Sequence, residues 1–302
     1  MDHKQLQANI LNFSLNDGAL GSQGYKKVLL QLFGLTGHGK SSFINSCQYV
    51  LDDKNQFEVI AEAGEKLDGS SMTQVRKAYE LTELITLVDN RGCSNMNDFQ
   101  KAEVFAQLGN FLPMDEEVHW EDNYSPMMEK VEEAKMEPNF TDFLVPIFVY
   151  SAENILAEKL VEDFKHFMNN CSDMTGVFPI IVLTNKTSGD YFALEKQFKL
   201  MGAEIVTAIE NYTVGRELKT LGKTTDILTV IDSALKNVRF RLEQPRNPEK
   251  EQRERKKFLL NYIHKAGQEK SEQERLKKEE EKKNEEKLGI WAWLRRFFGY
   301  KW

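Results

Sequence analysis

Short apolar runs alternate with longer amphipathic segments over much of this chain. The runs are Val28–Phe33, Ile85–Val88, Leu144–Val149, Pro179–Thr184 and Glu204–Ile209. Runs of this length are typical of buried strands, whereas apolar residues spaced three or four apart predict helices. The helical segments are Lys40–Val50, Glu153–Asn169, Ala193–Met201 and Asp226–Leu242. This alternation predicts an α/β fold, in which a mainly parallel sheet is covered by helices on both faces.

Two segments depart from the alternation. Residues 115–142 contain ten acidic and two basic side chains, and we expect an insert beside the sheet there. After QPRNP at residues 244–248 strand-like runs stop, and residues 249–288 are mostly Glu, Lys, Arg and Gln. Several opposite charges in this stretch lie four residues apart, which stabilises a helix by a few tenths of a kcal/mol per pair. We therefore expect a solvated, charged helix after the sheet.

The net charge of −7 is unevenly distributed. Residues 249–302 contain 16 basic and 11 acidic side chains, so the rest of the chain carries the acidic excess. An acidic body repels polyanions, and we expect no nucleic-acid binding. The three cysteines lack metal-like spacing, which favours reduced thiols and a cytoplasmic location. We expect no signal peptide, because the opening MDHKQLQANILNF is too polar to form its apolar core. We also expect no membrane span, because no apolar stretch approaches the ~20 residues that a span needs.

A glycine-rich stretch, GLTGHGKSS, follows the first apolar run and precedes a helical segment. The GxxxxGKS spacing in this context predicts a loop whose backbone N–H groups surround nucleotide phosphates. Lys40 would contact the β- and γ-phosphates, and the Ser41 hydroxyl would bind Mg²⁺. His38 is expected to be exposed, with a catalytic role left open. The predicted phosphate-contacting residues are Gly34, Gly37, His38, Gly39, Lys40, Ser41 and Ser42.

A second motif, LITLVDNRG, places an aspartate at the end of an apolar run. Asp89 would hold Mg²⁺ through water, and the Gly92 N–H would meet the γ-phosphate. Thr73, between the two motifs, is a candidate Mg²⁺ ligand and γ-phosphate sensor. Ser70 and Ser71 compete with it for this role.

The stretch PIIVLTNKTSGDY resembles the Asn-Lys-x-Asp turn by which guanine-specific proteins read the base. Asn185 and Lys186 match the turn, but Ser188 occupies the aspartate position. A serine cannot accept the two hydrogen bonds that guanine donates, so the choice between guanine and adenine stays open. Asp190 would restore the acceptor if the loop were bulged, and Asn211 would support the base from the other side.

Residues 25–242 resemble the GTPase domain of the interferon-induced protein 44 family. The resemblance rests on GLTGHGKSSFINS, LITLVDNRG, DFLVPIFVYSAEN, IIVLTNKTS and the longer IENYTVGRELKTLGKTTDILTVIDSAL. More distantly, the chain is similar to immunity-associated and immunity-related GTPases. The resemblance implies a three-layer P-loop GTPase-like domain, GTP/GDP and Mg²⁺ as ligands, and a role in interferon or immune responses. Cys93 stands where some members have a water-orienting glutamine, so hydrolysis is expected to be slow.

The last residues, GIWAWLRRFFGYKW, combine aromatic side chains with arginines. At helical spacing the apolar residues cover about half the circumference, a pattern typical of helices at a membrane surface. Docking onto this protein or onto another protein is the alternative, and a nucleotide-dependent homodimer also stays open. The expected organisation is an extension over 1–24, the GTPase-like domain over 25–242, a charged helix over 243–288 and an amphipathic tail over 289–302.

Two other functions remain open from the sequence. The first is a nucleotide-binding scaffold that does not hydrolyse GTP, which the serine at 188 and the cysteine at 93 favour. The second is an ATP-binding P-loop protein, against which the Asn-Lys pair after the fourth run argues.

Overall fold

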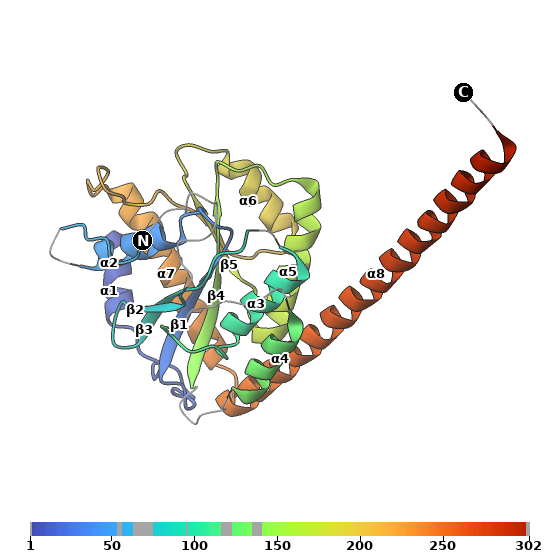
Figure 1. Ribbon diagram of the computed structural model, residues 1–302. Helices are drawn as coiled ribbons and strands as arrows, with labels where there is room; N and C mark the ends of the chain where they lie inside the picture. Colours follow the sequence, from blue (N-terminus) through green and yellow to red (C-terminus); the bar gives the residue numbers. More distant parts are fainter. Residues whose placement is uncertain are drawn as a thin grey trace.

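The computed structural model describes residues 2–52, 56–62, 75–94, 96–115, 123–134 and 141–299. Six strands and eight helices lie within these ranges (Figure 1). The strands are β1 Lys27–Phe33, β2 Lys77–Glu80, β3 Ile85–Asp89, β4 Asp142–Ser151, β5 Ile180–Thr184 and β6 Val206–Ala208. The helices are α1 His3–Leu11, α2 Lys40–Leu51, α3 Asp98–Leu108, α4 Tyr124–Glu133, α5 Glu158–Thr175, α6 Tyr191–Leu200, α7 Leu221–Leu242 and α8 Pro248–Phe298.

The strands form one sheet in the order β2-β3-β1-β4-β5-β6. All neighbouring pairs are parallel except β2 and β3. The predicted α/β class with a mainly parallel sheet is therefore confirmed. The antiparallel edge strand β2 was not predicted, because its sequence KAYE is half polar and mostly exposed. β1 lies between β3 and β4, so the loop after β1 begins in the interior of the sheet, with a strand on each side of it.

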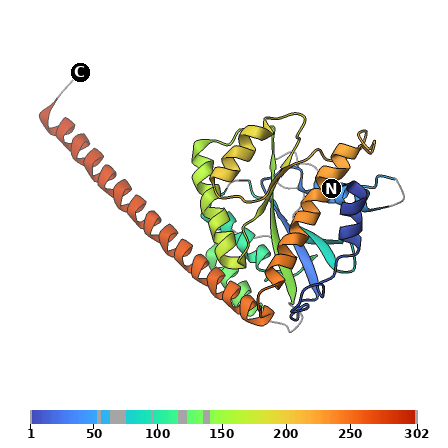
Figure 2. The same cartoon turned by 180° about the vertical axis from the view of Figure 1, so that it is seen from behind.

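Helices cover both faces of the sheet (Figures 1 and 2). One apolar core joins α1, α2 and α7 to one face, and a second joins α3, α4, α5, α6 and α8 to the other. The central strands are buried on both sides, which explains why they read as nearly continuous apolar runs. Helix α1 contributes to this arrangement, since its Leu6 and Ile10 are buried against α7.

The segment predicted as an insert contains the helix α4. Its buried residues Met127 and Val131 belong to the core that α8 completes. β4 begins at Asp142, the last residue of the segment predicted as an insert. The helix predicted from Glu153 begins at Glu158 instead, because Glu153 and its neighbours form contacts in the loop before it.

The charged region after residue 247 is a single helix of 51 residues, α8. Its first part packs on the body, with Leu259 and Ile263 fully buried. The prediction of a solvated helix is therefore wrong for this part, which contacts α3, α4 and α5. From residue 267 onward, the side chains that the structure describes are exposed, and the helix projects away from the sheet (Figures 1 and 2). None of the helices in the described ranges combines the length and apolar character needed to cross a bilayer.

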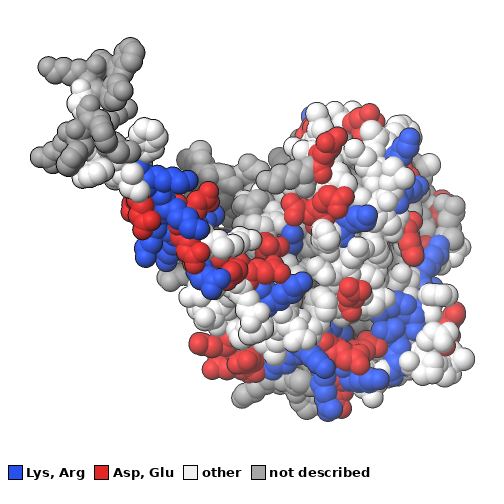
Figure 3. All heavy atoms as spheres, turned by 90° about the vertical axis from the view of Figure 1, so that its right-hand side faces the viewer, with Lys and Arg blue, Asp and Glu red and all other residues white. Residues whose placement is uncertain are grey.

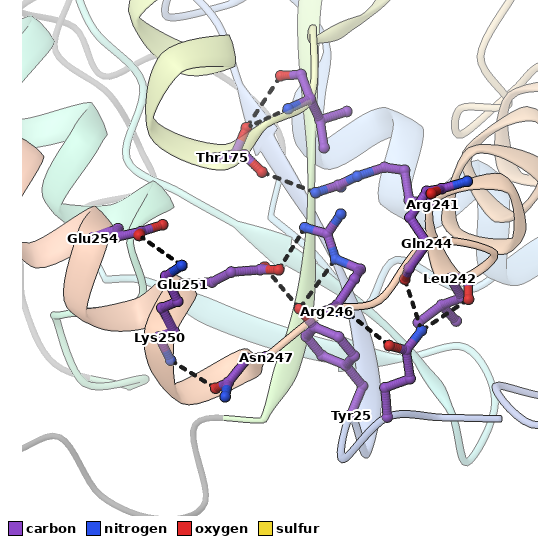
Figure 4. Close-up of polar contacts among 12 residues, drawn as sticks. Tyr25, Thr175, Arg241, Leu242, Gln244, Arg246, Asn247, Lys250, Glu251 and Glu254 are labelled. Carbon is purple, nitrogen blue, oxygen red and sulfur yellow. Dashed lines mark hydrogen bonds and ion pairs between the residues drawn. The ribbon is translucent and has the colours of Figure 1, made fainter. Parts of the chain in front are cut away.

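A polar cluster holds the corner between α7 and α8 (Figure 4). The Tyr25 hydroxyl donates to Glu251 Oε2 at 2.7 Å, and Arg246 Nη2 lies 2.8 Å from Glu251 Oε1. Arg241 donates to the carbonyl oxygen of Thr175 at 2.9 Å. The first two contacts join α8 to the residue two positions before β1 and to the loop before α8, and the third joins α7 to α5. Together they fix the direction in which α8 leaves the body.

Candidate functional site

The loop between β1 and α2 has a backbone that requires glycine at two positions. Gly34 has φ +148°, and a Cβ there would lie 2.2 Å from the carbonyl oxygen of Val149. Gly39 has φ +88° and is the N-cap of α2, a position where no side chain caps the helix. The first turn of α2 thus presents backbone N–H groups and the positive end of a helix dipole. Gly37 forms the exposed tip of the same loop, with φ +75°.

Lys40 is folded back into this loop. Its Nζ donates to the carbonyl oxygens of Gly34 and Leu35, at 3.3 and 3.1 Å. The side chain is only 6% exposed, and burial lowers its pKa, while Asp89 raises it. Gly92 lies directly beside it, since a Cβ on Gly92 would be 2.8 Å from Lys40 Nζ. The arrangement holds a cation against the loop after β1 and next to the loop after β3.

Ser41 and Asp89 form the next part of the site. The Ser41 hydroxyl donates to Asp89 Oδ2 at 2.9 Å, and both residues are buried. A hydroxyl and a carboxylate are hard oxygen ligands, which suit Mg²⁺. In the described ranges no group of three or more His, Cys, Asp or Glu side chains is arranged to hold a metal. A magnesium ion here would therefore take its remaining oxygens from water and from a phosphate ligand, as Mg²⁺ commonly does.

The loop after β3 is joined to the loop after β1. Leu35 and Cys93 form an isolated parallel bridge, in which the Thr36 N–H donates to the Cys93 carbonyl oxygen at 2.9 Å. The Cys93 thiol is buried against Met96, with the two sulfur atoms 3.4 Å apart. Burial raises its pKa to about 11, so it stays protonated at neutral pH. Cys93 therefore serves as a packed joint between the two loops.

His38 is 8% exposed, so the prediction of an exposed position is wrong. Its Nδ1 accepts a hydrogen bond from the Ser151 N–H at 3.0 Å, and its ring packs edge-on against Tyr150. Burial and then the nearby charge of Lys40 lower its pKa to about 4. The imidazole is therefore neutral at physiological pH and fastens the loop to the end of β4.

The turn after β5 lies at the same edge of the sheet. Asn185 has a positive φ of 56°, and its side-chain amide donates to Ser151 Oγ and to Glu153, both at 2.9 Å. Lys186 Nζ lies 2.6 Å from Asp226 of α7. The turn closes with a hydrogen bond from the Ser188 N–H to the Asn185 carbonyl oxygen at 3.0 Å. The first two predicted base-contacting side chains are thus held in defined positions.

Asp190 does not restore the missing acceptor. Its carboxylate accepts from the Ala193 N–H at 3.1 Å and caps α6. Asn211 also differs from expectation, because its side chain faces the loop before α2. Its amide donates to the Gly39 carbonyl oxygen at 3.3 Å, and its Oδ1 accepts from Ser46.

The structure therefore brings together most of the predicted residues from the ends of four strands. Thr184 Oγ1 adds a further link, donating to the His38 carbonyl oxygen at 2.9 Å. Ser42 is half-buried in the first turn of α2, where its carbonyl oxygen accepts from Ser46. Thr73, together with its competitors Ser70 and Ser71, lies outside the described residues.

Sequence reasoning missed a polar cluster under the loop after β3. Arg76 is fully buried and donates to Asn90 Oδ1 at 3.0 Å, to Gln31 at 3.3 Å and to Asn110 at 2.8 Å. Asn90 also donates to Gln31 at 2.9 Å. The available signal was Gln31 itself, a polar residue in the middle of an otherwise apolar strand. A buried amide there requires a hydrogen-bonding partner.

No protein-family model matches this sequence, and no curated protein matches it either.

Proposed function

We propose that this protein is a Mg²⁺-dependent GTP- and GDP-binding protein that acts as a slow GTPase switch. The observation that carries the proposal is the position of the Lys40 ammonium, held by two loop carbonyls beside the buried Ser41–Asp89 pair. Binding of a nucleoside triphosphate with its Mg²⁺ requires a cation, a hydroxyl and a carboxylate near one helix N-terminus. The interferon-induced protein 44 resemblance points to the same class.

In this proposal each group has a defined task. The N–H groups of the loop and of the first turn of α2 bind phosphate oxygens, and Lys40 neutralises the charge between the β- and γ-phosphates. Ser41 and Asp89 would hold Mg²⁺, which supplies charge neutralisation to the phosphates when bound. Gly92 would offer its N–H to the γ-phosphate, because it already lies against Lys40.

The expectation of slow hydrolysis rests on Cys93, which stands where some GTPases have the glutamine that orients the attacking water. Fast hydrolysis needs a side chain that orients this water, and an amide does this well. The Cys93 thiol is buried against Met96, so it offers no such group.

We propose that the protein is cytoplasmic and that the end of α8 contacts a membrane surface or a protein partner. Ile290, Trp291 and Trp293 are each more than half exposed, although large apolar side chains usually bury themselves. On the preceding turns of α8, positive and negative side chains are interspersed (Figure 3). Because neither sign dominates, the aromatic residues rather than charge would supply most of the attraction.

The main alternative is a protein that binds nucleotide without hydrolysing it and serves as a scaffold. The buried Cys93 favours this reading, and Ser188 leaves ATP as an alternative ligand. Single-turnover phosphate release from radiolabelled GTP separates the scaffold from the switch. Release that exceeds the buffer rate and disappears in Lys40→Ala supports the switch.

Binding of fluorescent GDP, GTP and ATP analogues tests the proposal as a whole. Lys40→Ala should weaken GDP and GTP binding by about 100-fold or more, since a charge-assisted contact to phosphate is lost. The matched control is Lys196→Ala, an exposed lysine of α6, which should bind as the wild type does. Wild-type protein that binds ATP but not GTP contradicts the guanine-nucleotide proposal.

A further inference from the structure

Four carboxylates surround the turn formed by residues 185–188, although none belongs to its fourth position. They are Glu153, Asp190, Glu210 and Asp226. Guanine presents two donors side by side, N1–H and the 2-amino group, and a carboxylate is the natural acceptor for both. The question is which of these four carboxylates is placed to accept them.

Three of the four are engaged elsewhere or weakly held. Asp190 caps α6 through the Ala193 N–H, and Asp226 forms an ion pair with Lys186. Glu153 is exposed, and a single hydrogen bond from Asn185 holds it. An exposed carboxylate on one contact is mobile and well hydrated, so binding a base there would cost both ordering and desolvation.

Glu210 differs from these three. It is 8% exposed and lies two residues after the end of β6. Its Oε2 accepts two hydrogen bonds from Thr187, from the N–H at 2.9 Å and from Oγ1 at 2.7 Å. Among the described residues its other oxygen, Oε1, has no hydrogen-bond donor. The carboxylate is therefore fixed against the turn by Oε2, and Oε1 can still accept hydrogen bonds.

The backbone also holds Glu210 at the turn. The Lys186 N–H donates to the carbonyl oxygen of Ile209 at 3.1 Å, and the Ile209 N–H donates to the Leu183 carbonyl oxygen at 2.7 Å. The residue before Glu210 is thus bound to the strand end and to the turn. A group that is already ordered by such contacts loses little freedom when it binds a ligand.

We infer that Glu210 reads the guanine base in place of an aspartate at position 188, with its Oε1 accepting hydrogen bonds from N1–H and the 2-amino group. This inference rests on the proposed function, because it places a nucleotide in the loop before α2. Adenine has an acceptor at N1 and no 2-amino group, so the same carboxylate disfavours ATP. Glu210 is thus a specificity residue for the base, and it takes no part in phosphate chemistry.

The test compares GDP, ADP and xanthosine diphosphate as competitors of a fluorescent GDP analogue. In Glu210→Gln the amide oxygen still accepts from Thr187, while the amide nitrogen donates to the 2-oxygen of xanthine. We expect GDP to bind about 10- to 100-fold more weakly, the effect of losing hydrogen bonds to a charged group. Xanthosine diphosphate should bind more tightly than it does to the wild type, and so should ADP, because the carboxylate that disfavours adenine is gone.

Two further variants make the outcome decisive. Glu153→Gln is the matched control and should leave the order of the three nucleotides unchanged. Adding Ser188→Asp to Glu210→Gln should restore GDP binding, because a carboxylate returns to the turn. Equal weakening of all three nucleotides in Glu210→Gln, or a preference switch in Glu153→Gln, overturns the inference alone. Wild-type protein that binds no nucleotide overturns the inference and the proposed function together.

Discussion

At the residue scale, His38 shows how a single side chain fixes the loop before α2. Its Nδ1 can accept the hydrogen bond from the Ser151 N–H only while that nitrogen carries no proton. Burial and the charge of Lys40 keep the imidazole neutral by lowering its pKa to about 4. The loop is thus held by a bond that depends on protonation.

This gives a prediction for the pH dependence of stability. The unfolded chain takes up the His38 proton near pH 6.5, whereas the folded chain takes it up only near pH 4. The free energy of unfolding should therefore fall as the pH drops from 6.5 to 4, by up to ~1.4 kcal/mol per pH unit from this residue. Above pH 6.5 the contribution is complete and constant.

Urea unfolding of the wild type and of His38→Asn at several pH values measures this contribution. The asparagine Oδ1 can still accept from Ser151, but the side chain does not titrate. The difference in free energy between the two proteins should change across pH 4 to 6.5 and be flat above it. A difference that is constant throughout contradicts the assignment.

The Arg76 cluster gives a second prediction at this scale. Asn90→Ala removes an acceptor from a fully buried guanidinium, whose pKa burial already lowers to about 9. We expect a loss of roughly 1–3 kcal/mol in the free energy of unfolding, the usual cost of a buried group left without its partner. Asn169→Ala, at an exposed position of α5, should change it by less than ~0.5 kcal/mol. Equal effects of the two variants, measured by urea unfolding, would show that Asn90 is not needed.

The sequence could identify the residues around Lys40 because their spacing is local and their backbone demands are strict. It could not identify Arg76, since its partners Gln31, Asn90 and Asn110 come from three separate segments. It also gave the wrong exposure for His38, because the groups that bury it belong to β4 and the following loop. Contacts between distant segments decide these features, and no spacing within one segment encodes them.

At the element scale, the first part of α8 belongs to the folded body. Leu259 is fully buried in the core that α3, α4 and α5 share, whereas Leu276 of the same helix is 53% exposed. Apolar residues at 258, 259, 262, 263 and 266 have helical spacing, which was visible in the sequence among the charges. The density of charge led to the prediction of a solvated helix, which holds only for the later turns.

This contrast between two leucines of one helix can be measured. Leu259→Ala should lower the free energy of unfolding by about 2–5 kcal/mol, because it leaves a cavity in a packed core. Leu276→Ala carries the same chemical change on an exposed turn and should alter it by less than ~0.5 kcal/mol. Denaturant unfolding compares them directly. Similar losses in both would mean that the later turns of α8 are also packed.

At the scale of the whole molecule, α8 separates the exposed aromatic residues from the sheet edge that carries the loop before α2. The double variant Trp291→Ser, Trp293→Ser should reduce co-sedimentation with anionic vesicles by roughly 10-fold or more, because apolar burial in the interface is lost. Phe192→Ser with Leu200→Ser removes two apolar side chains of α6 that are at least as exposed as the tryptophans, and it serves as the control. Unchanged sedimentation of the tryptophan variant would show that these two side chains do not make the contact with the vesicles.

The base of α8 is packed against the helix that follows the loop after β3. Phe105 of α3 contacts Tyr262 of α8, with ring centroids 5.0 Å apart, and also contacts Phe258. Lys256 donates to the carbonyl oxygens of Glu132 and Ala134 at 2.8 and 2.9 Å. The loop that contains Gly92 and Cys93 is thus followed directly by α3, the helix against which α8 packs.

This support has a geometrical consequence. The part of α8 beyond residue 266 is roughly 50 Å long at ~1.5 Å per residue. A stiff rod of that length magnifies rotation at its pivot, and a tilt of about 10° carries the far end through roughly 8 Å. A displacement of a fraction of an ångström where α8 packs on α3 therefore becomes a displacement of several ångströms at Trp291 and Trp293.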